Sequence, residues 1–103
     1  MLKGLRARIA RGIKFLDREY GRSWRRKVDP ETLALQNGSA CMLGQVEDSF
    51  EHALDVLGID GAKAASMGFN LTEYEREKFH IDERDTAYAE LTEAWRKVLK
   101  RGR

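Results

Sequence analysis

The sequence has one proline, one cysteine and no long apolar run, and each of these shortages excludes a class of protein. The single proline and the nine glycines exclude collagen-like, proline-rich and glycine-linker chains. Cys41 has no second cysteine with which to form an internal disulfide, which fits a reducing compartment. No segment approaches the roughly 18 apolar residues of a membrane span, and the first residues do not resemble a signal peptide. We therefore expect a cytoplasmic protein with no membrane partner.

The motifs that accompany common enzyme chemistries are absent too. The sequence contains no Cys-x-x-Cys pair, no His-Glu-x-x-His, no Gly-x-Ser-x-Gly elbow and no glycine-rich phosphate loop. A cysteine nucleophile needs a histidine base and a lowered thiol pKa, so we expect Cys41 to be a small buried residue instead. The sequence thus predicts no catalytic residue, no cofactor and no enzymatic activity.

Two pairs of residues have the spacing of metal ligands on a helix, namely Asp48 with His52 and Glu77 with His80. A di-metal bundle uses two Glu-x-x-His repeats together with further inward carboxylates, and only the second pair has this form. Cys41 and His52 would lie roughly 16 Å apart on one helix, too far to share a zinc ion. We therefore expect no metal site. The surroundings of His52 are interpreted as an exposed acidic face formed by Asp48, Glu51, His52 and Asp55.

The length suits one small domain, and the composition supports a packed core. Hydrophobic residues make up 42% of the chain and charged residues 35%, a balance that argues against disorder. The scarcity of proline favours long helices over a loop-rich sandwich. We predict an all-α fold, with a single domain over residues 1–103 built as a small bundle of three to five helices.

Apolar residues at intervals of three and four predict a basic amphipathic helix over residues 1–21, ended by Gly21. Its apolar stripe consists of Leu2, Leu5, Ile9, Ile13, Leu16 and Tyr20. Two carboxylates within this helix favour packing against a core over a membrane surface. Residues 22–38 are predicted as a connector with one short helix, which begins at Pro30 after the N-cap Asp29.

A second periodic segment predicts a central helix over residues 39–58, begun by Ser39 and ended by Gly58. Gly44 inside this helix costs about 1 kcal/mol relative to alanine, so we expect another helix to cross closely there. The remaining segments are predicted as a short helix over 60–68 capped by Asp60, a stretch over 71–82 that is either helical or loose, and a C-terminal helix over 82–100.

Charge is segregated along the chain, although the net charge is only +2. Residues 1–29 carry a net charge of +7, residues 30–70 carry −5, and the rest balances. The basic third either contacts nucleic acid or another anionic surface, or is neutralised by acidic residues of the same fold or of a partner. Trp24 either stacks on such a ligand or plugs one end of the core. The candidate interaction surface comprises Arg6, Arg8, Arg11, Lys14, Arg18, Arg22, Trp24, Arg25, Arg26 and Lys27.

Four short strings carry a resemblance to a known group: Cys41–Gln45, Leu57–Gly58, Gly68–Phe69 and Leu91–Arg96. Over residues 24–100 they resemble a group of small helical proteins encoded by actinobacteria and their phages. Members of the group typically have Cys-x-Cys before Leu-Gly-Gln, whereas this chain has Ser39 in place of the first cysteine. The segment 71–82 also looks longer here. The resemblance implies a small cytoplasmic helical protein with a host-interaction role if it is phage-encoded, and it implies no activity and no functional residues.

The remaining function class is recognition of another macromolecule. We predict a non-enzymatic interaction protein whose partner is a protein, and a homo-oligomer would bury any apolar surface that one small core leaves exposed. The alternative is a nucleic-acid-binding accessory protein that uses the basic N-terminal third on phosphates. Loss of duplex DNA binding with increasing salt distinguishes the two.

Overall fold

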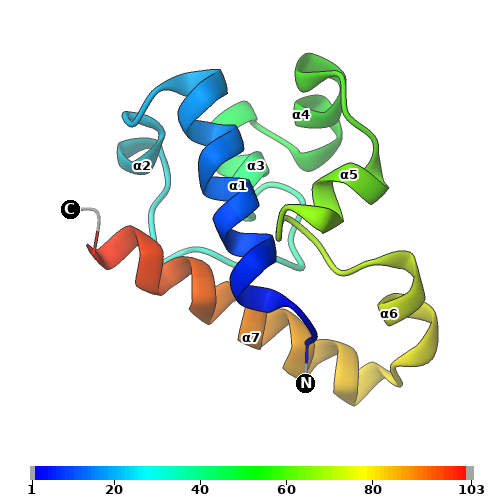
Figure 1. Cartoon of the computed structure of the whole chain (residues 1–103). Helices are drawn as coiled ribbons and strands as arrows, with labels where there is room; N and C mark the ends of the chain where they lie inside the picture. Colours follow the sequence, from blue (N-terminus) through cyan, green and yellow to red (C-terminus); the bar gives the residue numbers. More distant parts are fainter. Residues whose placement is uncertain (1, 102–103) are drawn as a thin grey trace.

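The computed structural model describes residues 2–101, and over these residues the chain forms seven helices and no strand (Figure 1). The predicted all-α class is confirmed, but the helices are more numerous and shorter than the three to five expected. They are α1 (Leu5–Tyr20), α2 (Trp24–Lys27), α3 (Met42–Glu47), α4 (Phe50–Leu57), α5 (Gly61–Ser66), α6 (Glu73–Lys78) and α7 (Ile81–Arg101).

The two long helices, α1 and α7, cross each other, and the shorter helices lie around them (Figure 1). Helix α1 ends where the sequence predicts, because Gly21 adopts a positive φ of 70° and donates its N–H to the carbonyl oxygen of Asp17. The predicted start of the C-terminal helix, α7, at residue 82 is one residue late. His80 precedes the helix and donates its N–H to the Glu83 carboxylate at 3.1 Å. With this cap the helix begins at Ile81.

The short helix of the connector lies at residues 24–27, and the prediction of a helix beginning at Pro30 is wrong. Asp29 does not cap a helix. Its carboxylate accepts the N–H of Glu31 at 2.9 Å in a local turn, while its own N–H donates to the Gln45 side chain at 2.6 Å. Because the backbone at Asp29 is tied to a residue of α3, the chain continues as a turn instead of winding into a helix.

The predicted central helix over 39–58 is broken into α3 and α4 by a tight turn at Asp48. This residue has φ 75° and ψ −43°, and the N–H of Ser49 donates to the carbonyl oxygen of Glu47 at 2.9 Å. That hydrogen bond closes a γ-turn, which is rare and strained for a non-glycine residue. Ser49 then caps α4 by accepting the N–H of His52 at 3.0 Å.

Two further expectations for this segment are wrong. Helix α3 is capped by Cys41, whose sulfur accepts the N–H of Gly44 at 3.3 Å, and not by Ser39. Gly44 has no room for a side chain, but its neighbour is the loop at Gly38, not a crossing helix. The carbonyl oxygen of Gly38 also accepts the N–H of Phe50 at 2.7 Å, so this loop binds both short helices.

The short helices α5 and α6 have strong local caps. Asp60 accepts the N–H of Lys63 at 2.8 Å and starts α5, as the sequence predicts. In the segment that the sequence left undecided, Thr72 and Glu75 form a reciprocal capping box that starts α6. Helix α6 buries no residue of its own, so its position depends on side-chain contacts with other elements.

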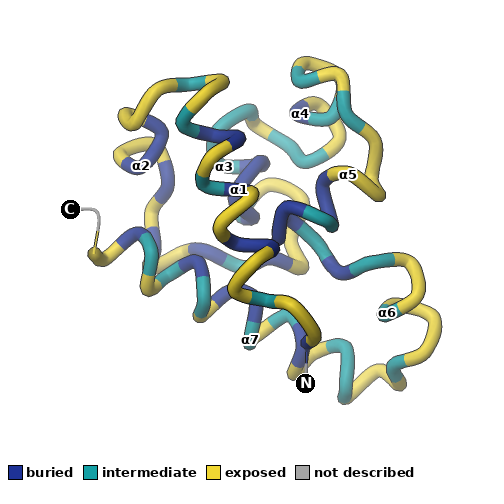
Figure 2. The backbone as a smooth tube through the Cα atoms, in the orientation of Figure 1, coloured by how far each residue is buried: buried dark blue, intermediate teal, exposed yellow. Residues whose placement is uncertain are grey.

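The core is organised around two fully buried tryptophans. Trp95 of α7 stacks on Phe69 with ring centroids 5.5 Å apart and meets Trp24 edge to face at 6.3 Å. Its indole N–H donates to the carbonyl oxygen of Gly68 at 2.6 Å. Trp24 is therefore a core residue and is not exposed for stacking on a ligand, and buried positions line the inner sides of α1 and α7 (Figure 2).

Candidate partner-binding groove

The ten residues of the candidate interaction surface do not form one surface. Arg8, Trp24 and Arg25 are buried, with exposed fractions of 5%, 0% and 9%. We therefore remove these three from the candidate surface, because a ligand cannot reach them without unfolding. The other seven are exposed: Arg6, Arg11, Lys14, Arg18, Arg22, Arg26 and Lys27.

Arg8 connects α1 to α6 by a two-pronged ion pair. Its guanidinium nitrogens donate to the two carboxylate oxygens of Glu75 at 3.0 and 3.2 Å, and one of them also donates to the carbonyl oxygen of Asn70 at 3.2 Å. Burial opposes the charged form of Glu75, but the hydrogen bonds from Arg8 and from the N–H of Thr72 outweigh it, so the pKa of Glu75 is lowered. This arginine therefore serves the fold.

Arg25 and Trp24 share one partner on α1, the carboxylate of Asp17. The indole N–H of Trp24 donates to Asp17 Oδ1 at 2.8 Å, and the guanidinium of Arg25 donates to the same oxygen at 2.9 Å. The hydrogen bond from Trp24 is the main reason that the pKa of Asp17 is lowered. Arg25 also lies over the Trp24 ring, 4.4 Å from its centroid.

Three of the exposed cations also contact their own chain. Arg11 donates to the carbonyl oxygen of Ser66 at 2.9 Å, Arg18 lies over the ring of Phe15, and Lys27 lies over the ring of Tyr20. The charged group of each of these side chains therefore has a partner within the fold, although all three residues are exposed. The remaining exposed cations of the candidate surface are Arg6, Lys14, Arg22 and Arg26.

A groove of about 570 Å³ lies between the first half of α1 and the C-terminal half of α7. We call it the α1–α7 groove. Of its apolar residues Ile9 is buried, Ala10 is exposed and the others are partly buried, and three cations complete its lining. The α1 residues of the lining are Leu5, Arg6, Ile9, Ala10 and Ile13, and the α7 residues are Ala94, Lys97, Val98 and Arg101.

The spacing of these residues shows why two helices make one continuous surface. Positions 5, 6, 9, 10 and 13 share one side of α1, and positions 94, 97, 98 and 101 share one side of α7. The lining contains cations but no carboxylate, so the groove combines apolar surface with positive charge alone.

The sequence analysis did not identify most of the residues that line the groove. Arg6 belongs to the candidate surface, but Lys97 and Arg101 look like ordinary cations at a helix C-terminus, where the helix dipole favours them. The available signal was that both amphipathic helices have more apolar positions than the core can bury. The core covers only part of the side chains of Leu5, Ile13, Ala94 and Val98. Only the crossing of α1 and α7 brings these residues together with Arg6.

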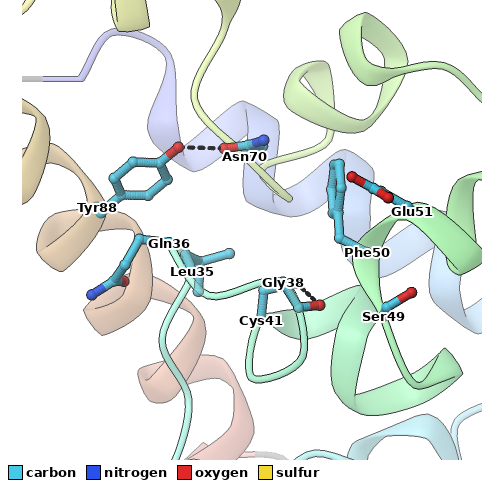
Figure 3. A pocket seen from close by; sticks show the side chains of 9 residues that line it. All are labelled: Leu35, Gln36, Gly38, Cys41, Ser49, Phe50, Glu51, Asn70 and Tyr88. Atoms are coloured by element: carbon cyan, nitrogen blue, oxygen red, sulfur yellow. Dashed lines mark hydrogen bonds between the residues drawn. The ribbon is translucent and has the colours of Figure 1, made fainter.

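A smaller hollow of about 190 Å³ contains Cys41, and its chemistry is poor (Figure 3). The thiol is 1% exposed, and burial raises its pKa. Tyr88 donates to the Asn70 side chain at 2.8 Å, so the two polar groups opposite Cys41 bind each other. Neither histidine lines the hollow, so no imidazole base faces the thiol there, and the one carboxylate of the lining is that of Glu51.

The described residues form neither a cluster of metal ligands nor a membrane-spanning helix. Within residues 2–101, no three His, Cys, Asp or Glu side chains are grouped so that they could hold a metal ion. In the same part of the chain, no helix has the length and apolar character needed to cross a bilayer.

Comparison of the chain with protein-family models, with curated proteins and with solved structures finds no match. The resemblance to proteins of actinobacteria and their phages therefore stays a prediction.

Proposed function

We propose that this protein is a non-enzymatic interaction protein that binds an acidic amphipathic helix of a protein partner in the α1–α7 groove. The observation that carries the proposal is the lining of that groove, which is apolar along both helices and has cations but no acid among its residues. The resemblance to proteins of actinobacteria and their phages adds that the partner is a cytoplasmic host protein if the chain is phage-encoded.

The groove suits a helix because of its dimensions and its apolar spacing. Its α1 side spans residues 5–13, about 12 Å along the helix axis, which corresponds to roughly two turns of a bound helix. A helix that docks in a groove presents apolar anchors at intervals of three and four, and these would lie against Ile13, Ala94 and Val98. The small side chain of Ala94 allows the backbone of a partner to approach.

The charges specify which helix binds. Arg6, Lys97 and Arg101 are exposed, so each contributes little affinity, but together they attract acidic segments and disfavour basic ones. Association should therefore weaken with added salt while the apolar contacts persist.

A pair of helical peptides tests the proposal. Both carry the same apolar stripe, and one has glutamates beside the stripe where the other has lysines. We expect only the acidic peptide to bind 15N-labelled protein and to shift the amide signals of residues 5–13 and 94–101. Absence of shifts at peptide concentrations of about 1 mM, where even weak complexes form, overturns the proposal.

Two glutamate substitutions on α7 provide a matched pair. Val98→Glu places a negative charge in the groove and should abolish peptide binding, whereas Ala89→Glu adds the same charge at an exposed position outside it. Circular dichroism shows whether both variants stay folded. Equal loss of binding in the two variants contradicts a site in the groove.

Nucleic-acid binding is the second candidate, and the exposed cations outside the groove favour it. Arg22 and Arg26 lie at α2, away from the groove lining, and Lys14 lies on the exposed side of α1. Contacts with phosphates would make binding to random duplex DNA fall steeply with salt, and the double variant Arg22→Glu, Arg26→Glu would remove it. No DNA binding at low salt rules this candidate out.

A further inference from the structure

Helix α4 has an exposed surface whose charge is opposite in sign to that of the groove. Between Ser39 and Ala62 the chain has five acidic residues and no lysine or arginine. Helix α4 lies in this segment and buries only Ala53. Its outward side, which we call the α4 acidic face, consists of Glu51, His52, Asp55 and Val56.

The α4 acidic face is apolar as well as charged. The Val56 side chain is 54% exposed, one of three large hydrophobic residues that the described part of the chain leaves open to this degree. Positions 51 and 55 are one turn apart, as are positions 52 and 56, so the two carboxylates form one exposed row and His52 and Val56 form the row beside it. An acidic helix with an exposed apolar residue is the kind of ligand that the α1–α7 groove fits.

We infer that the α1–α7 groove also binds the α4 acidic face of a second copy of this chain, giving weak head-to-tail self-association. In this contact Val56 lies against the small residues Ala10 and Ala94, and the carboxylates of Glu51 and Asp55 approach the cations of the groove. The inference rests on the groove of the proposed function and names one of its occupants.

The contact has to form between copies. Helix α4 and the C-terminal half of α7 lie on opposite sides of the molecule, so a chain cannot place its own α4 in its own groove (Figure 1). The two surfaces differ, so the contact is heterologous, and in a pair one copy keeps an unused α4 acidic face while the other keeps an unused groove. Both surfaces are small, which gives a weak complex that an acidic partner helix can displace.

Mixing two variants tests the head-to-tail arrangement directly. Val98→Glu blocks the groove and leaves α4 intact, whereas Asp55→Lys blocks the α4 acidic face and leaves the groove intact. Each variant alone should be monomeric by analytical ultracentrifugation at concentrations where the wild type associates. An equimolar mixture should form one-to-one dimers and nothing larger, because only one complementary pair of surfaces remains.

Further measurements separate this inference from the proposed function. We expect high salt to dissociate the wild type, Asp55→Lys to weaken self-association at least about tenfold, and the acidic peptide to compete with it. Asp55→Lys should still bind the acidic peptide. A wild type that stays monomeric at about 1 mM, or variants that do not combine on mixing, overturns self-association, and peptide binding then decides the proposed function separately.

Discussion

A Cβ atom on Gly12 would lie 2.8 Å from Cζ2 of Trp95, so α1 crosses the indole ring with no space for a side chain. The same indole stacks on Phe69 and donates its N–H to the carbonyl oxygen of Gly68. One side chain thus fixes the distance between α1, α7 and the turn after α5. This distance sets the position of α1 beside α7, and the groove depends on it.

Gly12→Ala should lower the free energy of unfolding by about 2 kcal/mol, because the added methyl group meets the Trp95 ring and the backbone oxygen of Met67. Chemical denaturation monitored by tryptophan fluorescence measures the change. Gly61→Ala is the matched control, since a Cβ there meets nothing within 4 Å, and it should be neutral or slightly stabilising. An equal loss in both variants would show that the close crossing at Gly12 has no energetic consequence.

The ion pair between Arg8 and Glu75 should make stability fall in acid. The pKa of Glu75 is lowered from its model-compound value of 4.5, so its stabilising contribution is complete above that pH. The contribution is lost as the pH falls through the lower pKa of the folded state. Glu75→Gln leaves Arg8 buried without a countercharge and should lower the free energy of unfolding at neutral pH by about 3 kcal/mol.

The pH profile of stability checks this assignment. Below pH 4.5 the wild type should lose stability more steeply than Glu75→Gln, because the variant has no carboxylate to protonate at that position. Glu77→Gln, at an exposed position of the same helix, should keep the profile of the wild type. A parallel fall in the wild type and in Glu75→Gln would mean that other groups, such as Asp17, determine the acid dependence.

Local signals predicted those elements that local interactions form. Gly21 and Gly58 end helices with positive φ angles, and Asp60 starts α5 through its own side chain. The break at Asp48 was missed because the apolar positions continue at helical spacing through it. Ser49 was a usable signal, since serine before an apolar residue is a common N-cap.

The misassigned residues depend on contacts between distant parts of the chain. Arg8 is buried because its guanidinium binds Glu75, which lies 67 positions later in the sequence. The spacing of residues within α1 cannot identify a partner so far along the chain. The groove was missed for the same reason, since Arg6 and Arg101 lie at opposite ends of the sequence. Amphipathic spacing identifies the apolar side of each helix, but the crossing of two helices decides which part of that side stays open.

The γ-turn at Asp48 predicts a stabilising substitution. Asp48→Gly should raise the free energy of unfolding by about 1 kcal/mol, because glycine adopts positive φ without strain and this relief exceeds its greater loss of chain entropy. The control Asp55→Gly, inside the exposed face of α4, should lower it by about 1 kcal/mol. Destabilisation by both glycines would indicate that Asp48 is not held in a strained conformation.

Cys41 should be almost unreactive in the folded protein. Its thiol is 1% exposed, its sulfur accepts the N–H of Gly44, and burial raises its pKa, so little thiolate is present or accessible. Ellman's reagent at pH 8 should modify the native protein at least about a hundredfold more slowly than the urea-unfolded protein, since reaction requires local opening. Gly44→Ala pushes against the loop at Gly38 and should speed the reaction by favouring that opening. Equal rates in native and unfolded protein would show that the thiol is reachable and would restore Cys41 as a candidate nucleophile.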